Sequence, residues 1–205
     1  MRSRPAPAAS LDPTPMTPGG VHDMSLAPHH LDTPTDDTRR QFVAAMGNAA
    51  TGVTVVATDG PAGRLAQTVS AMCSVSADPP SLLVCVNRRS PLVAAVRRNQ
   101  VFSVNVLSTG QAHVSDTFAG RPAAGEPYDF GCAHWHRLDS GAPGLTGAAA
   151  VFDCRLAEAR PLGTHVVLVG SVLASRCTDL MPLTYHARSY GAHHPIDPQQ
   201  GAQPR

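Results

Sequence analysis

Short β-branched segments recur through the middle of this chain, with turn-forming residues between them. They are VTVVAT at 53–58, RLAQTVSAMCSVS at 64–76, SLLVCV at 81–86, VFSVNVL at 101–107 and two strands within 148–176 joined by a turn near 161–163. Runs of this length favour strands, and the clusters DGPAG and ADPPS favour turns. We therefore predict a small antiparallel barrel or an α+β domain. A doubly wound nucleotide-binding fold is not indicated, because no G-x-G-x-x-G motif follows a strand.

Three other segments have the spacing of helices. In TDDTRRQFVAAMGNAATG, Thr35 or Asp36 is suited to cap a helix that ends before Gly52, and residues 42, 45, 46 and 49 form one face. SPLVAAVRRNQ at 90–100 predicts a second helix, and GQAHVSDTFAG at 110–120 predicts a short third one. The fold is therefore expected to be mainly β with short helices.

The two ends of the chain differ in composition from the middle. Residues 1–35 are rich in Pro, Ala, Thr and Gly, and such a segment buries too little apolar surface to offset the entropy of ordering. We predict a disordered Pro-rich tail over 1–35, in which His29 and His30 are solvated, one folded domain over 36–190, and a flexible tail over 191–205.

The charge and the cysteine content of the chain limit which partners it can bind and in which cellular compartment it is expected. The chain of 205 residues has a net charge of +1 and shows no basic stripe with interleaved aromatic residues, which argues against a nucleic-acid surface. Its five cysteines include no C-x-x-C pair, which favours reduced thiols and a cytoplasmic location. No apolar run is long enough to span a bilayer, so we expect no membrane partner and no signal peptide.

Hydroxyl side chains are unusually frequent in the strand-like segment at 64–76. Alternation places Thr68, Ser70, Met72, Ser74 and Ser76 on one face. One interpretation is the exposed face of an edge strand. The other is a wall against which a flat ligand lies, because small side chains leave backbone N–H and C=O groups accessible to it.

The segment VNRRS at 86–90 lies where a strand gives way to a helix. Asn87 and Ser90 precede the helix, and Arg88 and Arg89 lie beside its start, which is typical of an anion site. The alternative is that Ser90 only caps the helix and the arginines are solvated. Taken together, the small-residue wall and the anion site suit a planar heterocycle that carries a phosphate.

Several segments resemble, in order and spacing, one known family. They are GVTVVAT, QTVSAMCSVSADPPSLLVCVNRRS, FSVNVL, TFAG, GTHVVLVGSV and PLTYHARSY. The chain is similar through them, over roughly residues 39–190, to the short-chain flavin reductases, which are the reductase components of two-component flavin-dependent monooxygenases. The resemblance implies an antiparallel Greek-key split β-barrel that binds FMN. It also implies an NAD(P)H-dependent enzyme that reduces FMN or FAD by hydride transfer, works as a homodimer and supplies reduced flavin to a partner monooxygenase.

The resemblance also implies site residues. The isoalloxazine ring and ribityl chain would lie along Gln67, Thr68, Val69, Ser70, Ala71 and Cys73. Asn87, Arg89 and Ser90 would hold the phosphate, with Asn105 as a weaker candidate. His165 in GTH would lie on the nicotinamide side, where we also assign it as the catalytic candidate, and Tyr190 would help cover that side; the alternative for His165 is a turn residue outside any site.

Three points leave alternatives open. Relatives often carry Ser-Phe directly after T-V-S, where this chain has Ala71 and Met72. They often carry Thr or Ser at the next position, where this chain has Cys73. Residues 132, 134 and 136 alternate as Cys, His and His, a possible metal cluster, although flavin chemistry needs no metal and we assign none. The barrel would also suit a flavin- or haem-binding carrier or sensor without nicotinamide turnover, or an oxidase of the pyridoxamine-phosphate type.

Overall fold

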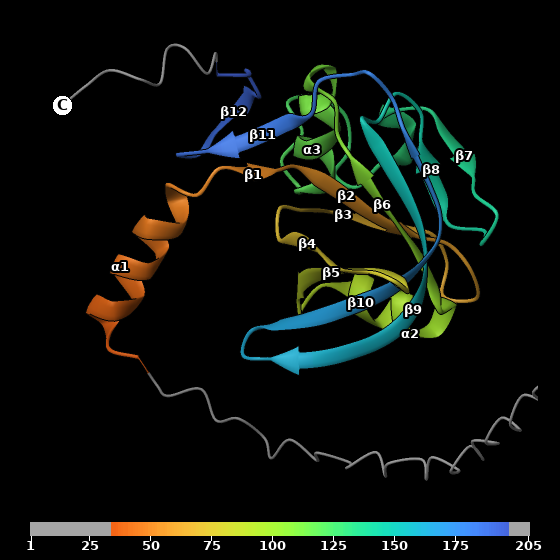
Figure 1. The fold of residues 1–205 in the computed structure, drawn as a ribbon, viewed down its shortest axis with the longest axis horizontal. Coiled ribbons are helices and arrows are strands. Elements are labelled where there is room, and N and C mark those ends of the chain that lie inside the picture. Colours follow the sequence, from red (N-terminus) through yellow and green to blue (C-terminus); the bar gives the residue numbers. More distant parts are fainter. Residues whose placement is uncertain (1–33, 197–205) are drawn as a thin grey trace, which may run out of the picture. The chain divides into compact units, whose positions relative to one another are not determined.

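The computed structural model describes residues 34–196, so most of the tails predicted over 1–35 and 191–205 lies outside the described residues. The chain folds mainly into antiparallel strands, which confirms the predicted fold class (Figure 1). Among the described residues, none of the helices combines the length and apolar character needed to cross a bilayer.

A seven-stranded sheet forms the body of the domain. Its strands are β2 (Thr54–Thr58), β3 (Leu65–Val69), β4 (Met72–Ala77), β5 (Pro80–Asn87), β6 (Val101–Val106), β9 (Ala150–Leu162) and β10 (His165–Cys177). They lie in the order β3-β2-β6-β9-β10-β5-β4, and every neighbouring pair is antiparallel. The two edge strands, β3 and β4, are consecutive in the chain, so the sheet curls until its edges are joined only by Ser70 and Ala71.

The helices follow local signals. Helix α1 (Asp36–Gly47) begins after Thr35, whose side chain accepts a hydrogen bond from the Thr38 N–H. Helix α2 (Pro91–Asn99) begins after Ser90 and ends at Gln100, which adopts a left-handed conformation. Helix α3 (Ala112–Phe118) follows a short 3₁₀ turn, η1 (Thr109–Gln111), and a second such turn is η2 (Phe130–Cys132).

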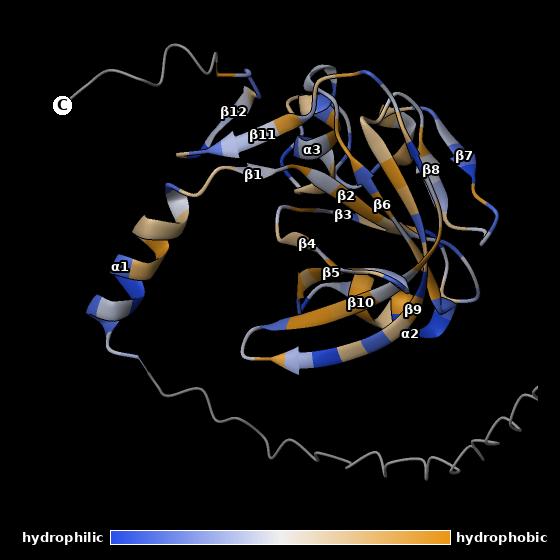
Figure 2. Cartoon of the chain, in the orientation of Figure 1, coloured by the Kyte–Doolittle hydropathy of each residue, from blue (hydrophilic) through white to orange (hydrophobic). Residues whose placement is uncertain are grey.

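Two apolar clusters lie on opposite sides of β2 and β6. One fills the barrel, where side chains of β2, β5, β6 and β10 meet the apolar face of α2. The other lies under α3 and includes Leu107, Phe118 and Leu145. Because β2 is covered on both faces, all five of its residues are buried. Figure 2 shows apolar residues in these strands and also on α1, which buries none of its residues.

Small sheets complete the fold and correct parts of the expected pattern. Strands β1 (Thr51–Gly52), β11 (Leu183–His186) and β12 (Ser189–Ala192) form one sheet, and β7 (Trp135–Arg137) pairs with β8 (Pro143–Leu145). We predicted none of these five strands. The segment predicted as one strand at 64–76 is two strands, because β3 pairs with β2 whereas β4 pairs with β5.

Candidate functional site

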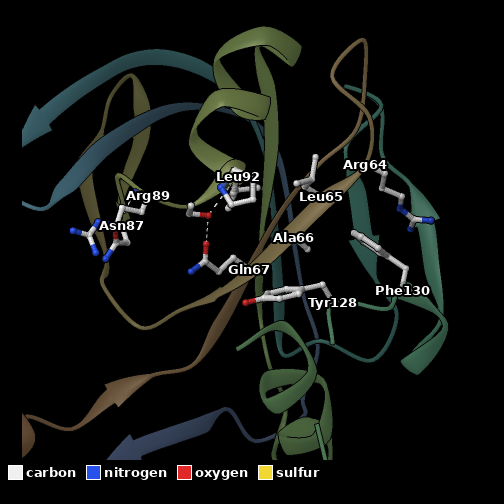
Figure 3. Close-up of a pocket in the computed structure, with 11 residues that line it drawn as sticks. Arg64, Leu65, Ala66, Gln67, Asn87, Arg89, Leu92, Tyr128 and Phe130 are labelled. Carbon is white, nitrogen blue, oxygen red and sulfur yellow. Dashed lines mark hydrogen bonds between the residues drawn. The ribbon is translucent and has the colours of Figure 1, made fainter. Parts of the chain in front are cut away.

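A cavity of about 570 Å³ opens between β3, the start of α2 and the loop after α3 (Figure 3). Strand β3 contributes one wall, the junction of β5 and α2 contributes the second, and the loop that precedes η2 contributes the third. The residues that line it are Arg64, Leu65, Ala66, Gln67, Asn87, Arg89, Ser90, Pro91, Leu92, Tyr128 and Phe130. Four predicted phosphate- or flavin-contacting residues, at positions 67, 87, 89 and 90, therefore meet in one place.

Hydrogen bonds fix the side chains at the start of α2. Ser90 Oγ accepts a hydrogen bond from the Leu92 N–H at 3.2 Å and donates one to Gln67 Oε1, so it caps the helix and also ties α2 to β3. Asn87 Oδ1 accepts a hydrogen bond from the Arg89 N–H at 2.9 Å. Ser90 is therefore both a helix cap and part of the cavity wall.

These bonds leave donors facing the cavity. The amide oxygens of Gln67 and Asn87 are both used within the protein, and their NH₂ groups have no partner among residues 34–196. The Arg89 side chain is exposed beside them, and the positive end of the α2 dipole adds to its charge. No carboxylate is among the eleven lining residues, so this wall of the cavity favours an anion.

The predicted nicotinamide-side histidine lies next to Asn87 in the sheet. His165 begins β10, and its Cα pairs with that of Asn87 across the β5–β10 ladder. The Arg88 N–H donates to the Thr164 carbonyl at 3.0 Å, which holds the turn before His165 against the start of α2. The imidazole is exposed and its Nδ1 lies 2.9 Å from Thr164 Oγ1. Residues almost eighty positions apart are thereby brought to one end of the sheet.

The residues predicted to line the flavin ring lie at the link between the two edge strands. Ser70, Ala71 and Cys73 are exposed, whereas Val69 is 6% exposed and its side chain belongs to the core. Thr68 Oγ1 donates to the Ser115 carbonyl at 2.7 Å, so its hydroxyl is used to hold α3 against β3. Within residues 34–196, no strand pairs with the outer edges of β3 and β4 in this sheet, which leaves backbone groups on these edges available to a ligand.

The thiol of Cys85, on the strand next to this link, stays protonated at neutral pH. Cys73 on β4 is exposed and Cys85 on β5 is half-buried. Burial raises the pKa of the Cys85 thiol, and the proximity of Cys73 raises it further. A neutral Cys85 is a packing residue and not a nucleophile.

Two other predicted site residues lie away from the cavity. Asn105 is fully buried, and its side chain makes all its hydrogen bonds inside the protein: Nδ2 donates to the Val55 carbonyl and to Ser103 Oγ, and Oδ1 accepts from the Leu145 N–H. We therefore leave Asn105 out of the site that we propose. Tyr190 on β12 lies against α3, and the structure does not bring it together with His165 on the main sheet.

The hydroxyl of Tyr190 is engaged by α3. It lies 2.7 Å from Asp116 Oδ1 and 2.9 Å from Ser115 Oγ. Burial raises the pKa of this hydroxyl, the hydrogen bond with Ser115 opposes that shift, and Asp116 adds to it. Since Ser115 also accepts the Thr68 hydroxyl bond, Tyr190 is connected to β3 through α3 and does not reach the cavity itself.

The possible metal cluster does not form. Cys132 is half-buried against the cluster under α3, and His136 Nδ1 lies 3.5 Å from Thr146 Oγ1. Across residues 34–196, no three His, Cys, Asp or Glu side chains lie close enough together to hold a metal ion.

Sequence reasoning missed the third wall of the cavity. Tyr128 and Phe130 come from the Pro/Gly-rich loop, and Arg64 precedes β3. The available signal was a pair of aromatic residues in EPYDFG, a segment otherwise typical of a surface loop. Nothing local indicated that this loop faces β3.

Comparisons with known proteins agree with this geometry. The sequence profile described as flavin reductase like domain matches residues 46–194. A protein named FMN reductase (NADH) RutF, from Bradyrhizobium diazoefficiens, is 44% identical over 164 residues, which cover 78% of this chain and 87% of that protein.

Solved structures show the same fold. BorF, described as the flavin reductase component of a bacterial two-component tryptophan halogenase, is 33% identical and superposes with a TM-score of 0.68 over 75% of this chain and 97% of its own. The NADH:FAD oxidoreductase SgcE6 of Streptomyces globisporus is 25% identical, with a TM-score of 0.70 over 82% of this chain and 100% of its own.

Proposed function

The chain belongs to the flavin reductase like domain family, and from this premise we propose that it is an NADH-dependent flavin reductase. In this proposal it takes up FMN or FAD along β3 and the start of α2, and NADH reduces the flavin by hydride transfer. The reduced flavin then leaves for a separate monooxygenase. The relatives are named as NADH-dependent flavin reductases and as reductase components of two-component systems, which supports both halves of the proposal.

One observation carries the proposal. Gln67 from β3 and Asn87 from the end of β5 present amide donors to one cavity, beside Arg89 and the positive end of α2. This donor set matches a phosphate, which accepts several hydrogen bonds and carries negative charge. The residues present therefore fit the phosphate end of a flavin nucleotide.

The link between β3 and β4 fits the ring end. Ser70 and Ala71 are small and exposed, and they follow Gln67 along the chain in the direction away from Arg64. Small side chains on an edge strand allow a flat ring to approach the backbone, whose N–H and C=O groups then pair with the ring heteroatoms. Cys73, the second residue of β4, would border the same surface.

A bound flavin supplies the electron chemistry, since its N5 atom accepts a hydride from nicotinamide C4. The work of the chain is to bind both molecules and to align them. We propose that His165 orients the nicotinamide side, because it pairs with Asn87 at the phosphate end of the cavity and its ring is exposed. Tyr190 would act indirectly, by holding α3 against β3 through Ser115.

Steady-state turnover tests the proposal. NADH oxidation should rise steeply when free FMN or FAD is added, and NADPH should be tested in parallel with each flavin. Tightly retained flavin without NADH consumption would instead indicate a carrier or sensor. Consumption of oxygen with pyridoxamine phosphate would indicate the related oxidase activity.

The phosphate site can be tested without turnover. Replacing Arg89 with Ala should raise the flavin dissociation constant about 10- to 150-fold, because a hydrogen bond to a charged group contributes about 1.5–3 kcal/mol. Arg98→Ala removes an equally exposed arginine at the other end of α2 and should leave the constant unchanged. Flavin fluorescence quenching measures both, and equal affinities in the two variants would remove Arg89 from the site.

A further inference from the structure

The cavity continues past the phosphate site, away from the surface assigned to the flavin ring. Gln67 and Ser90 lie near its middle, and Ser70, Ala71 and Cys73 are not among its lining residues. In Figure 3 the cavity runs from Asn87 and Arg89 across Gln67 to Arg64, Tyr128 and Phe130. A flavin bound as proposed would place its ring on one side of the phosphate and leave this other end open.

The open end is walled by aromatic rings. The Phe130 ring packs edge-on against Phe118 and Trp135, with centroids 5.0 and 5.1 Å away, and the Arg64 guanidinium carbon lies 4.1 Å above its centroid. Tyr128 lies beside Ala66 in the same view, with its hydroxyl directed toward Gln67 (Figure 3). This end, formed by Arg64, Tyr128 and Phe130, is referred to below as the aromatic end.

Tyr128 is held in place although its ring is exposed. Its side chain is 53% exposed and its backbone has a φ of 63°, a left-handed conformation that is unfavourable for a bulky residue. The Tyr128 N–H donates to the Thr117 carbonyl at 3.0 Å, and a Cβ added at Gly120 would lie 2.6 Å from the Tyr128 hydroxyl. Residues with strained backbone cluster at active sites and ligand sites.

The chemistry of the aromatic end suits a purine base. Adenine stacks on aromatic rings and on arginine planes, and Arg64 and Tyr128 offer both within one cavity. With the flavin phosphate beside Asn87 and Arg89, a second phosphate joined to it would lie nearer to Gln67, between them and the aromatic end. The volume of about 570 Å³ is within the range for sites that enclose a sizeable ligand.

We propose that the aromatic end binds the adenosine half of FAD, so that this chain prefers FAD to FMN. The inference rests on the proposed function, since it takes the α2 start as the flavin phosphate site. It assigns roles to Arg64, Tyr128 and Phe130 that the phosphate site alone does not require.

Binding of oxidised flavin, measured by fluorescence in the absence of NADH, tests the inference on the full-length chain. The wild-type protein should bind FAD more tightly than FMN. Tyr128→Ala should raise the dissociation constant for FAD about 5- to 100-fold, the range expected when one base loses its stacking partner, and should change that for FMN less than twofold. Tyr128→Phe keeps the ring and should retain most of the affinity for FAD, which separates stacking from loss of fold. Arg64→Gln should weaken FAD binding in the same direction as Tyr128→Ala.

Other results of these binding measurements would overturn either the inference or the proposed function. Equal loss of FMN and FAD affinity in Tyr128→Ala would show that the aromatic end holds the isoalloxazine ring, and would overturn the inference. An unchanged FAD affinity with a raised KM for NADH, measured with FMN as the flavin, would assign the end to the adenosine of NADH and would also overturn it. Equal wild-type affinity for FMN and FAD would overturn this inference alone, whereas failure to bind either flavin would overturn the proposed function.

Discussion

Asn87 and Asn105 carry the same side chain and differ only in where the fold places them. Asn87 ends β5 at the surface and lines the cavity, and its one bond, accepted by Oδ1 from the Arg89 N–H, leaves the NH₂ group unused among residues 34–196. Asn105 lies in β6 between two covered faces, and its amide joins β2, β6 and β8. The first asparagine is therefore available to a ligand and the second stabilises the core.

Replacing Asn87 and Asn105 with Ala, one at a time, should separate effects on flavin binding from effects on the free energy of unfolding. Asn105→Ala leaves the buried Leu145 N–H without its partner and removes the side-chain bond to the Val55 carbonyl, which should lower the free energy of unfolding by roughly 1–3 kcal/mol. Its affinity for flavin should stay unchanged. Asn87→Ala should do the reverse, with weaker flavin binding and little loss of stability.

Urea unfolding and flavin titration on both variants check this pair. A wild-type unfolding midpoint together with lost flavin affinity in Asn105→Ala would return Asn105 to the site. At the residue scale, the sequence could predict that Asn87, Arg89 and Ser90 lie together, because a strand-to-helix junction has local signals. It could not exclude Asn105, because the strand that covers it, β8, lies about forty residues further along the chain.

Elements with local signals were predictable. The Thr35 and Ser90 caps, the β-branched runs and the turn near 163 predicted α1, α2 and the main strands. The break at Ser70 and Ala71 was not predictable, because the hydroxyl pattern continues across it and only pairing with β2 or β5 separates β3 from β4. Strands β11 and β12 were missed because PLTYHARSY is short and polar.

Strand β10 depends on a close contact that only glycine allows. A Cβ added at Gly170 would lie 2.6 Å from Phe102 Cζ and 3.0 Å from Cys154 Cβ. Both neighbours are fully buried and belong to the barrel core, so neither can move freely. The tight packing at Gly170 therefore sets how closely β10 approaches the side chains of β6 and β9.

Gly170→Ala should destabilise the protein by about 1–3 kcal/mol, the usual cost of overfilling a packed core. Gly52→Ala is the matched control, because a Cβ at Gly52 would meet no atom within 4 Å. Thermal unfolding measures both. In a Phe102→Leu background the penalty at Gly170 should shrink, since the ring atom that causes the clash is gone. A penalty that is the same in both backgrounds would show that the contact with Phe102 is not its source.

At the scale of the whole molecule, helix α1 is held to the rest of the described chain at its C-terminal end, where the Ala187 N–H donates to the Gly47 carbonyl, and its apolar face stays uncovered. It buries none of its residues, and Phe42, Val43 and Met46 are 63%, 54% and 52% exposed. A helix of twelve residues is marginally stable in water by itself, so an uncovered apolar face favours association. We propose that a second copy of the chain covers this face, which agrees with the homodimer expected from the sequence. Exposed Val75 on β4 and Leu173 on β10 offer apolar surface for it.

The double variant Phe42→Ser, Met46→Ser should convert a dimer to a monomer, because it removes most of the apolar surface of α1 and leaves the barrel core unchanged. Light scattering after size exclusion, at several protein concentrations, measures the mass. Ile196→Ser is the control, because it removes an apolar side chain that is 82% exposed but lies in the C-terminal segment. A monomeric wild-type protein would refute the association, and a dimer that survives the double variant would place the interface on another surface.

If flavin affinity falls together with dimerisation, the site at the junction of β3 and β4 requires the second copy. If affinity is retained by the monomer, one chain is sufficient for binding.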